Sequence, residues 1–300
     1  MRVIWTVARF AVAFLLVGSS ALATGLAPPA SRISIHVERG DCGTARTQDI
    51  ETVLKSVADV LVPYFPQRAS SRVLVASSRK GPRVLLEKSP DGAYLVLLNV
   101  QDTRWDQFAY QFSHELCHLF ANSEHRELSG DVVARDHQWF EEALCEAVSL
   151  FTLKQMASSW EYLPPYPHWK DYAPAFREYA ERLSGETHRH LPRDIPVADW
   201  YADNREALES NPYLREKNEF LATQLIALLE EAPGGLEAIG YLNLEESSFS
   251  KSFEAYLDSW YSCCPEEIRD FTRRVISLFT RGDRGVTAIA AETVSGGIPN

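Results

Sequence analysis

Two histidines and a glutamate lie within five consecutive residues of the chain, in the run His114-Glu115-Leu116-Cys117-His118. In an α-helix, residues four apart lie on the same face, one turn from each other. A helix through this run therefore directs both imidazoles toward one place, with the carboxylate of Glu115 beside them. This spacing is typical of a catalytic zinc site. The run predicts a metal site.

The residues around the run predict an amphipathic helix over about residues 105–121. Thr103 and Asp106 suit the N-terminal end of a helix, and Asn122 suits its C-terminal end. A helical wheel separates an apolar sector, which can face a core, from a polar sector, which can face a cleft. The apolar sector holds Phe108, Phe112, Leu116 and Leu119, and the polar sector holds Gln111, His114, Glu115 and His118.

A catalytic zinc site needs a third protein ligand, with water in the fourth position. Residues 139–146 open a second predicted helix with an apolar stripe on one side. Glu142 and Glu146 project from the opposite side, four residues apart and therefore neighbours. Glu141 is an alternative ligand on the same helix, and without a metal these acids would form a solvated helix face.

The two segments together resemble the gluzincin clan of zinc metallopeptidases, the thermolysin-like and aminopeptidase-like enzymes. In that clan the third ligand is a glutamate on the helix after the H-E-x-x-H helix, often preceded by an aromatic pair and followed by a small residue. The resemblance covers roughly residues 105–155. It implies one zinc ion per chain held by His114, His118 and Glu142, Glu115 as the general base, and Glu146 as a carboxylate that holds a zinc-bound histidine.

Glu141 competes with Glu142 for the third ligand position. Glu141 shares a helix face with Cys145, so a cleft lined by Glu141 would leave the pair of Glu142 and Glu146 unexplained. We therefore expect Glu142 to be the ligand.

The metzincin pattern, another arrangement of zinc ligands, fits this chain less well. That pattern requires a glycine three residues after the second histidine and a third histidine three residues later. Ala121 and Glu124 occupy those positions.

The implied reaction is hydrolysis of a peptide bond by metal-activated water, with Glu115 accepting a proton and passing it to the leaving amine. Two alternatives stay open: a catalytically silent metal-binding or interaction protein on the same fold, and hydrolysis of a non-peptide amide, as in cell-wall turnover. The developing oxyanion needs another donor, commonly a tyrosine or histidine in this clan. The candidates are Tyr166, His168, Tyr172 and Tyr179.

The N-terminal residues predict export. Arg2 and Arg9 precede an apolar stretch over residues 10–17, and Ser20-Ala21-Leu22-Ala23 offers a cleavage site. We expect a signal peptide over residues 1–23 and a periplasmic or extracellular mature protein without stable membrane insertion. The alternative is an uncleaved anchor, but the apolar run is shorter than the roughly 20 residues that span a bilayer.

The charge balance restricts the partners of the chain. It has 41 acidic against 30 basic side chains and a net charge of −11, and loss of residues 1–23 would remove two arginines. Such an acidic domain argues against nucleic acid or anionic membrane as a partner. The expected partner is a peptide or protein substrate, and the sequence does not determine an oligomeric state.

Five cysteines in an exported chain allow two disulfides and a free thiol. A bridge between Cys117 and Cys145 would join the two ligand-bearing helices, and two buried thiols are the alternative. A bridge from Cys42 to Cys263 or Cys264 could tie the N-terminal strand to the C-terminal helices.

The predicted fold class is α+β: a zincin-like N-terminal lobe of sheet and helix that carries the active-site helix, then a mainly helical C-terminal lobe. Strands are expected at 33–38 and 72–76, a helix at 47–61, and a hairpin from 84–88 and 94–100 that could align an extended substrate. Later helices are expected at 171–184, 213–231, 248–262 and 265–280. The predicted division is a signal peptide at 1–23, a catalytic lobe at 24–158, a helical lobe at 159–281 and a flexible tail at 282–300.

Overall fold

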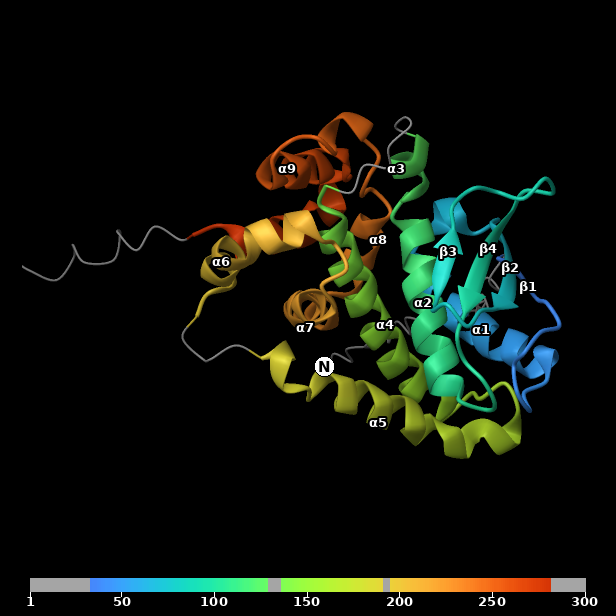
Figure 1. Ribbon diagram of the computed structural model, residues 1–300. Coiled ribbons are helices and arrows are strands. Elements are labelled where there is room, and N and C mark those ends of the chain that lie inside the picture. The colour runs from blue at the N-terminus through green and yellow to red at the C-terminus, as the bar shows by residue number, and fades with distance from the viewer. Residues whose placement is uncertain (1–32, 129–135, 191–194, 282–300) are drawn as a thin grey trace, which may run out of the picture. The chain divides into compact units, whose positions relative to one another are not determined.

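A four-stranded mixed sheet lies in the N-terminal part of the chain (Figure 1). The computed structural model describes residues 33–128, 136–190 and 195–281. The predicted signal peptide and C-terminal tail lie outside these residues. Within the described part, the mixture of a small sheet and many helices agrees with the predicted α+β class.

The sheet has the strand order β1-β2-β4-β3. β1 pairs with β2 and β2 with β4 in parallel, whereas β3 pairs with β4 antiparallel, with Val84 opposite Val96. The predicted hairpin is therefore confirmed, and it leaves β3 at one edge of the sheet. The strands are β1 (Ser34–Val37), β2 (Arg72–Ser77), β3 (Arg83–Leu85) and β4 (Ala93–Leu98).

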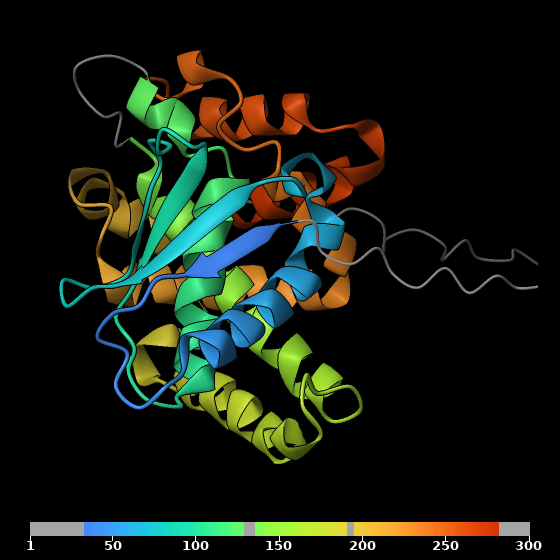
Figure 2. The same cartoon turned by 90° about the vertical axis from the view of Figure 1, so that its right-hand side faces the viewer.

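Helices α1 (Thr47–Leu61) and α2 (Trp105–Phe120) contact each other and the sheet. Figure 2 views the sheet face-on, with the green α2 behind it. The apolar sector that the helical wheel predicts for α2 is buried in the core. Asn122 follows the helix with a positive φ of 57°, a conformation that asparagine adopts more readily than most residues, so the predicted C-terminal stop is confirmed. At the other end, no side chain caps the helix, so the capping role suggested for Thr103 or Asp106 is wrong. Asp106 does lie in the first turn, where its charge suits the helix dipole, and its carboxylate accepts a hydrogen bond from Tyr172.

The long helix α4 (Gln138–Trp160) packs against α1 and α2 as well as against α5 and α7. Apolar residues surround it on nearly all sides, which is typical of a helix inside a core. The predicted boundary at residue 158 falls within its last turn. Residues on both sides of that boundary therefore share one hydrophobic core.

The remaining helices agree in part with the prediction. Those expected at 171–184, 213–231, 248–262 and 265–280 are present with shifted ends. In the described part of the chain, every helix is too short or too polar to span a membrane. α6 was not expected, because its polar sequence buries only Ala198, Tyr201 and Leu208. The helices are α3 (Glu124–Leu128), α5 (Ala173–Ser184), α6 (Val197–Ser210), α7 (Arg215–Glu231), α8 (Leu236–Ile239), α9 (Phe253–Cys263) and α10 (Arg269–Phe279).

Short 3₁₀ turns connect several of these elements. They are η1 (Val62–Tyr64), η2 (Pro66–Arg68), η3 (Pro167–Tyr172), η4 (Thr187–Arg189), η5 (Pro233–Gly235), η6 (Glu246–Ser248) and η7 (Glu266–Ile268).

All five cysteines lie in the described residues and all are free thiols. Cys117 and Cys145 are fully buried and share a hydrogen bond between α2 and α4, in agreement with the alternative of two buried thiols. The suggested bridge from Cys42 is wrong. Cys42 packs beside Val37 near the start of the sheet, whereas the Cys264 thiol lies against the carbonyl of Ala238.

Candidate metal centre

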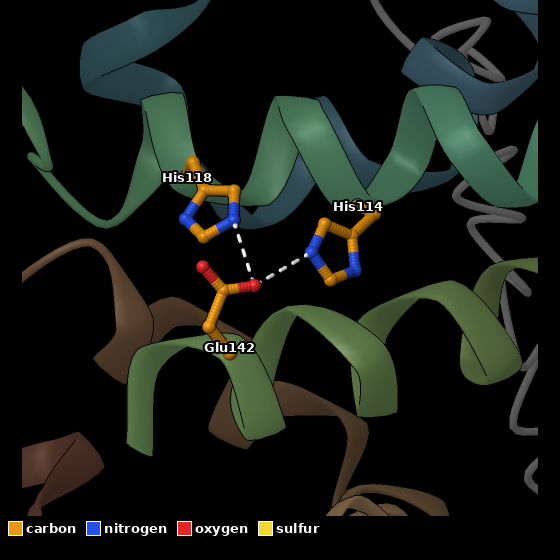
Figure 3. Close-up of side chains that lie close together, drawn as sticks. All are labelled: His114, His118 and Glu142. Atoms are coloured by element: carbon orange, nitrogen blue, oxygen red, sulfur yellow. Dashed lines mark hydrogen bonds and ion pairs between the residues drawn. The ribbon is translucent and has the colours of Figure 1, made fainter. Parts of the chain in front are cut away.

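Two imidazoles from α2 and one carboxylate from α4 converge at one point (Figure 3). The Glu142 Oε2 atom lies 3.2 Å from His114 Nε2 and 3.5 Å from His118 Nε2. The two helices pack through their apolar faces, which turns these polar side chains toward each other at the edge of the contact. The three residues could hold a metal ion.

The spacing of these atoms fits a small divalent ion in tetrahedral coordination. Ligand atoms that each lie about 2.0–2.1 Å from a tetrahedral ion are about 3.3–3.4 Å from one another. The distances of 3.2 and 3.5 Å from Glu142 Oε2 to the two Nε2 atoms bracket that value. Glu142 Oε2 is therefore spaced from each imidazole nitrogen as one ligand of such an ion is from another.

The charges at the centre stabilise each other without a metal. Burial disfavours the protonated form of His118, but Glu142 and the hydrogen bond to Glu141 outweigh it and raise the pKa of His118 well above its usual value. Burial also acts to lower the pKa of His114, but the hydrogen bond between His114 and Glu142 outweighs burial, so the pKa of His114 is raised. Burial likewise opposes ionisation of Glu142, yet His118 and His114 lower its pKa far below the usual value. The two histidines and Glu142 therefore favour each other's charged forms.

Glu115 lies between the two histidines in sequence and borders the same cleft. Its side chain is nearly completely buried, and burial raises its pKa while the two neighbouring histidines oppose the rise. A carboxylate with a raised pKa is better suited to accepting and returning a proton near neutral pH.

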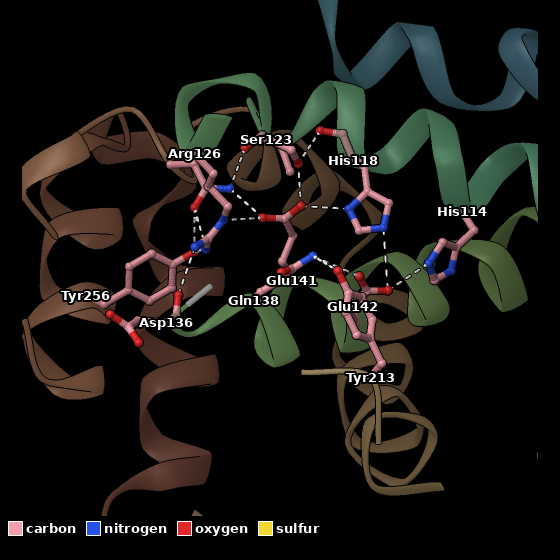
Figure 4. A network of polar contacts seen from close by, with 12 residues as sticks. His114, His118, Ser123, Arg126, Asp136, Gln138, Glu141, Glu142, Tyr213 and Tyr256 are labelled. Carbon is pink, nitrogen blue, oxygen red and sulfur yellow. Dashed lines mark hydrogen bonds and ion pairs between the residues drawn. The ribbon is translucent and has the colours of Figure 1, made fainter. Parts of the chain in front are cut away.

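Behind His118, a buried polar network surrounds Glu141 (Figure 4). His118 Nδ1 lies 2.6 Å from Glu141 Oε1, and Arg126 Nε donates to Glu141 Oε2 at 2.9 Å. Asn243 Nδ2 also donates to Oε2, at 2.8 Å, and Ser123 donates to Oε1. Burial alone would favour the neutral acid, but the contacts with His118 and Arg126 lower the pKa of Glu141 to about 2.

This network distinguishes the two adjacent glutamates of α4. Glu141 is only 1% exposed, and both of its carboxylate oxygens are hydrogen-bonded. Glu142 faces the Nε2 atoms of both histidines instead. The structure therefore brings Glu142, rather than Glu141, together with His114 and His118.

Glu146 does not take the position that the sequence suggested for it. Its carboxylate accepts a hydrogen bond from Arg189 at 2.7 Å and another from Tyr110. Glu141 is the carboxylate that contacts a histidine of the centre. The physical reason is the direction of the side chains: Glu146 lies one turn farther along α4, next to Arg189, which is fully buried and needs an anionic partner.

The centre opens into a cleft of about 730 Å³. One wall is the edge strand β3 with its flanking residues, and the opposite wall comes from α5 and the start of α7. The floor is formed by the polar sector of α2 and the first turns of α4. Residues that border the cleft include Val84, Gln111, Glu115, Gln138, Tyr179 and Tyr213.

Of the four candidate oxyanion donors, Tyr179 borders the cleft. Tyr166 contacts the hydroxyl of Thr52, His168 stacks against Tyr166, and Tyr172 donates to Asp106. These three side chains are engaged in contacts with other parts of the fold.

Tyr213 is a cleft residue that the sequence analysis missed. Its hydroxyl accepts a hydrogen bond from Gln138 Nε2 at 3.0 Å, and the same Nε2 atom lies 3.5 Å from Glu142 Oε1 (Figure 4). Tyr213 lies in the connection between α6 and α7, where no periodic pattern marks a side chain as facing the site. The preceding Asn211-Pro212 is the only local signal, and it indicates a turn.

A second group of potential metal ligands consists of Glu186, His188 and Glu219. His188 Nε2 lies 2.5 Å from Glu219 Oε2, which is a hydrogen-bond distance and too short for two ligands of one tetrahedral ion. Arg215 and Arg189 contact the other oxygen of Glu219 at 2.7 and 3.3 Å. These guanidinium groups already compensate the acids, so we assign this group to a hydrogen-bonded ion-pair cluster.

Comparison of the chain with protein-family models and with curated proteins finds no match. The assignment of the site therefore rests on the motif and its geometry.

Replacement of His114 should distinguish the two groups of ligands. We expect the protein to bind one divalent ion per chain, with zinc or cobalt as the probe. His114→Ala should lose this binding, whereas His188→Ala should retain it, because only the first group has the spacing of a coordination sphere. Isothermal titration calorimetry measures both. Loss of the ion in His188→Ala with retention in His114→Ala would reverse the assignment.

The affinity for the ion should fall as the pH is lowered. Both histidines must release the Nε2 proton before they bind the ion. Their pKa values are raised above about 6.5, so protons compete with the ion for these nitrogens already at a pH above that value. We expect the dissociation constant to rise by about one to two decades per pH unit below the histidine pKa values. Competition with a chromophoric chelator between pH 8 and pH 5 measures it. If the affinity did not change over this pH range, imidazole ligands would be excluded.

Proposed function

We propose that the protein is a zinc-dependent hydrolase of peptide bonds of the gluzincin type. The observation that carries the proposal is the convergence of His114, His118 and Glu142 beside the carboxylate of Glu115 in one cleft. A site that only stores an ion needs no acid beyond its ligands, yet Glu115 borders the same cleft. The presence of Glu115 therefore favours an enzyme over a silent metal-binding protein.

The donor set favours zinc. Two imidazole nitrogens and one carboxylate oxygen are the ligands that a catalytic zinc ion takes in peptidases, and a fourth position remains for water. Cys117 does not compete for the ion, since its thiol is fully buried in the contact with Cys145. When bound, zinc would act as a Lewis acid toward water and toward a substrate carbonyl.

Glu115 handles the proton in this proposal. One of its carboxylate oxygens accepts a proton from the attacking water and returns it to the nitrogen of the leaving amine. Burial raises the pKa of Glu115, which brings its affinity for a proton closer to what this exchange needs near neutral pH. His114 and His118 cannot replace it, because their Nε2 atoms face Glu142.

The edge strand β3 supports an extended peptide as the substrate. β3 pairs with β4 on one side, and its residues border the cleft. Backbone groups on the free side of an edge strand can pair with an added strand, which holds a peptide by its main chain. This arrangement favours a peptide over a compact amide as the substrate.

The predicted signal peptide leads us to propose that the enzyme is exported.

Tyr213 is the donor that we propose for the developing oxyanion. Its hydroxyl is linked to Glu142 through Gln138, so it lies close to the centre on the cleft side. Tyr213 is 54% exposed, which leaves the residue accessible to a substrate. Tyr179, the other cleft tyrosine among the candidates, is located on α5.

The decisive variant for the proposed reaction is Glu115→Gln. It preserves size but cannot accept a proton, so cleavage of casein or of a peptide library should fall by about 10²–10⁴-fold. Zinc content should stay at one ion per chain, because Glu115 is not among the ligands. Glu178→Gln, the same substitution at an exposed residue of α5 that does not border the cleft, serves as the control and should keep most of the activity. Equal turnover in Glu115→Gln would refute the proposed base.

Removal of the Tyr213 hydroxyl tests the proposed oxyanion donor. Tyr213→Phe should lower kcat by about 10²-fold with a small change in KM, because the hydroxyl acts mainly in the transition state. Tyr166→Phe is the matched control, since that hydroxyl contacts Thr52 instead. Similar kcat values for the two variants would assign the oxyanion to another donor.

A further inference from the structure

A loop of the C-terminal part contacts both helices of the metal centre. Residues 240–243 follow α8 and precede η6. Asn122, directly after α2, donates from Nδ2 to the carbonyls of Gly240 and Leu242 at 2.9 and 2.8 Å. Asn243 donates from its own Nδ2 to the carbonyl of Ala121 at 2.9 Å. The loop is therefore held against the end of α2 by two asparagine side chains.

Asn243 also reaches the start of α4. The same Nδ2 group donates to Glu141 Oε2 at 2.8 Å, and Oδ1 accepts hydrogen bonds from Tyr256 at 2.7 Å and Arg126 at 3.0 Å. Asn243 is 3% exposed and has a positive φ of 59°. Asparagine tolerates this backbone better than most residues, but the conformation persists only where the surroundings hold it.

Arg126 supplies the positive charge of this network. It is 3% exposed, and Nε donates to Glu141 Oε2 at 2.9 Å while its guanidinium lies over the ring of Phe249. A buried guanidinium and a buried carboxylate are tolerated only as a hydrogen-bonded pair. Arg126 therefore keeps Glu141 anionic in a place that water does not reach.

The two oxygens of Glu141 have separate partners. Arg126 and Asn243 hold Oε2, whereas Oε1 contacts His118 Nδ1 at 2.6 Å. Because a carboxylate is rigid and planar, fixing Oε2 also fixes Oε1. An Nδ1–H donated to Oε1 leaves the lone pair of Nε2 directed at Glu142 and at the position of the ion.

We propose that Asn243 and Arg126 are positioning residues of the metal centre. Acting through Glu141, they orient the imidazole of His118 and so increase the affinity for the ion. The inference rests on the proposed function only in that an ion is bound by His114, His118 and Glu142. Asn243, more than one hundred positions after the motif, would then help to control how tightly the motif holds its metal.

The test compares two substitutions of the same kind. Asn243→Gly and Asn122→Gly each remove a buried carboxamide from a residue with positive φ, and each removes a contact between the loop and α2. Only Asn243 contacts Glu141. Glycine accepts the backbone conformation at both positions. Each variant also takes an acceptor from an arginine, Arg126 in Asn243→Gly and Arg68 in Asn122→Gly, so the two differ in the contacts with Glu141 and Tyr256 that Asn243 alone makes.

Zinc affinity is measured by competition with a chromophoric chelator on the whole protein at pH 7.5, with circular dichroism of the metal-free protein to verify folding. We expect Asn243→Gly to raise the zinc dissociation constant by about 10–100-fold, the range for loss of a partner that orients a ligand. Asn122→Gly should stay within about 2-fold of the unmodified protein, since Glu141 keeps its contacts. The visible spectrum of the cobalt-loaded protein should change in Asn243→Gly alone.

If both variants bound zinc equally weakly, the affinity would depend on docking of the loop and not on the contact with Glu141, which would overturn the proposal. An unchanged zinc affinity in Asn243→Gly would also overturn the positioning role of Asn243, but it would leave the proposed metal centre intact. Failure of the unmodified protein to bind zinc overturns the proposed function together with this inference. Should Asn243→Gly not fold, Arg126→Lys carries the same prediction and decides the case, because it keeps the charge but loses the planar set of donors.

Discussion

The packing of α2 against α4 is the contact on which the rest of the structure depends. Both helices bury their apolar faces in one core, and that contact sets the rotation of each helix about its axis. Rotation decides which of two adjacent glutamates faces the histidines, because neighbouring residues on a helix point about 100° apart. Glu142 thus lies 3.2 and 3.5 Å from the two Nε2 atoms, and Glu141 lies on the far side of His118.

Charge compensation explains why so many acids are tolerated in one region. Glu141 is paired with Arg126, Glu146 with Arg189, and Glu142 with the two histidines. Each pairing satisfies a carboxylate that burial alone would neutralise. Glu115 differs, because burial raises its pKa despite the adjacent histidines. The cleft therefore combines two acids paired with arginines, one acid paired with the histidines of the candidate metal centre, and one acid suited to proton transfer.

Local periodicity was sufficient to predict most elements of the fold. The predicted helix at 47–61 coincides with α1, and the polar and apolar sectors of α2 face the cleft and the core as expected. α6 was missed because few of its residues are buried. The partners of Glu141 could not be foreseen either: Asn243 is about one hundred residues away, and no pattern in the sequence connects them. Glu146 was misplaced because spacing identifies a helix face but not the neighbour that the face will meet.

X-ray absorption at the zinc edge of the zinc-loaded protein tests the central claim most directly. Convergence of the two helices on one ion predicts a shell of nitrogen and oxygen at about 2.0–2.1 Å, with the outer scattering of two imidazole rings and no sulfur. Substitution of Glu142 by alanine should remove one oxygen from that shell. A zinc–sulfur distance of about 2.3 Å, or a shell without imidazole scattering, would contradict the account, because the ion would then be bound elsewhere than between His114, His118 and Glu142.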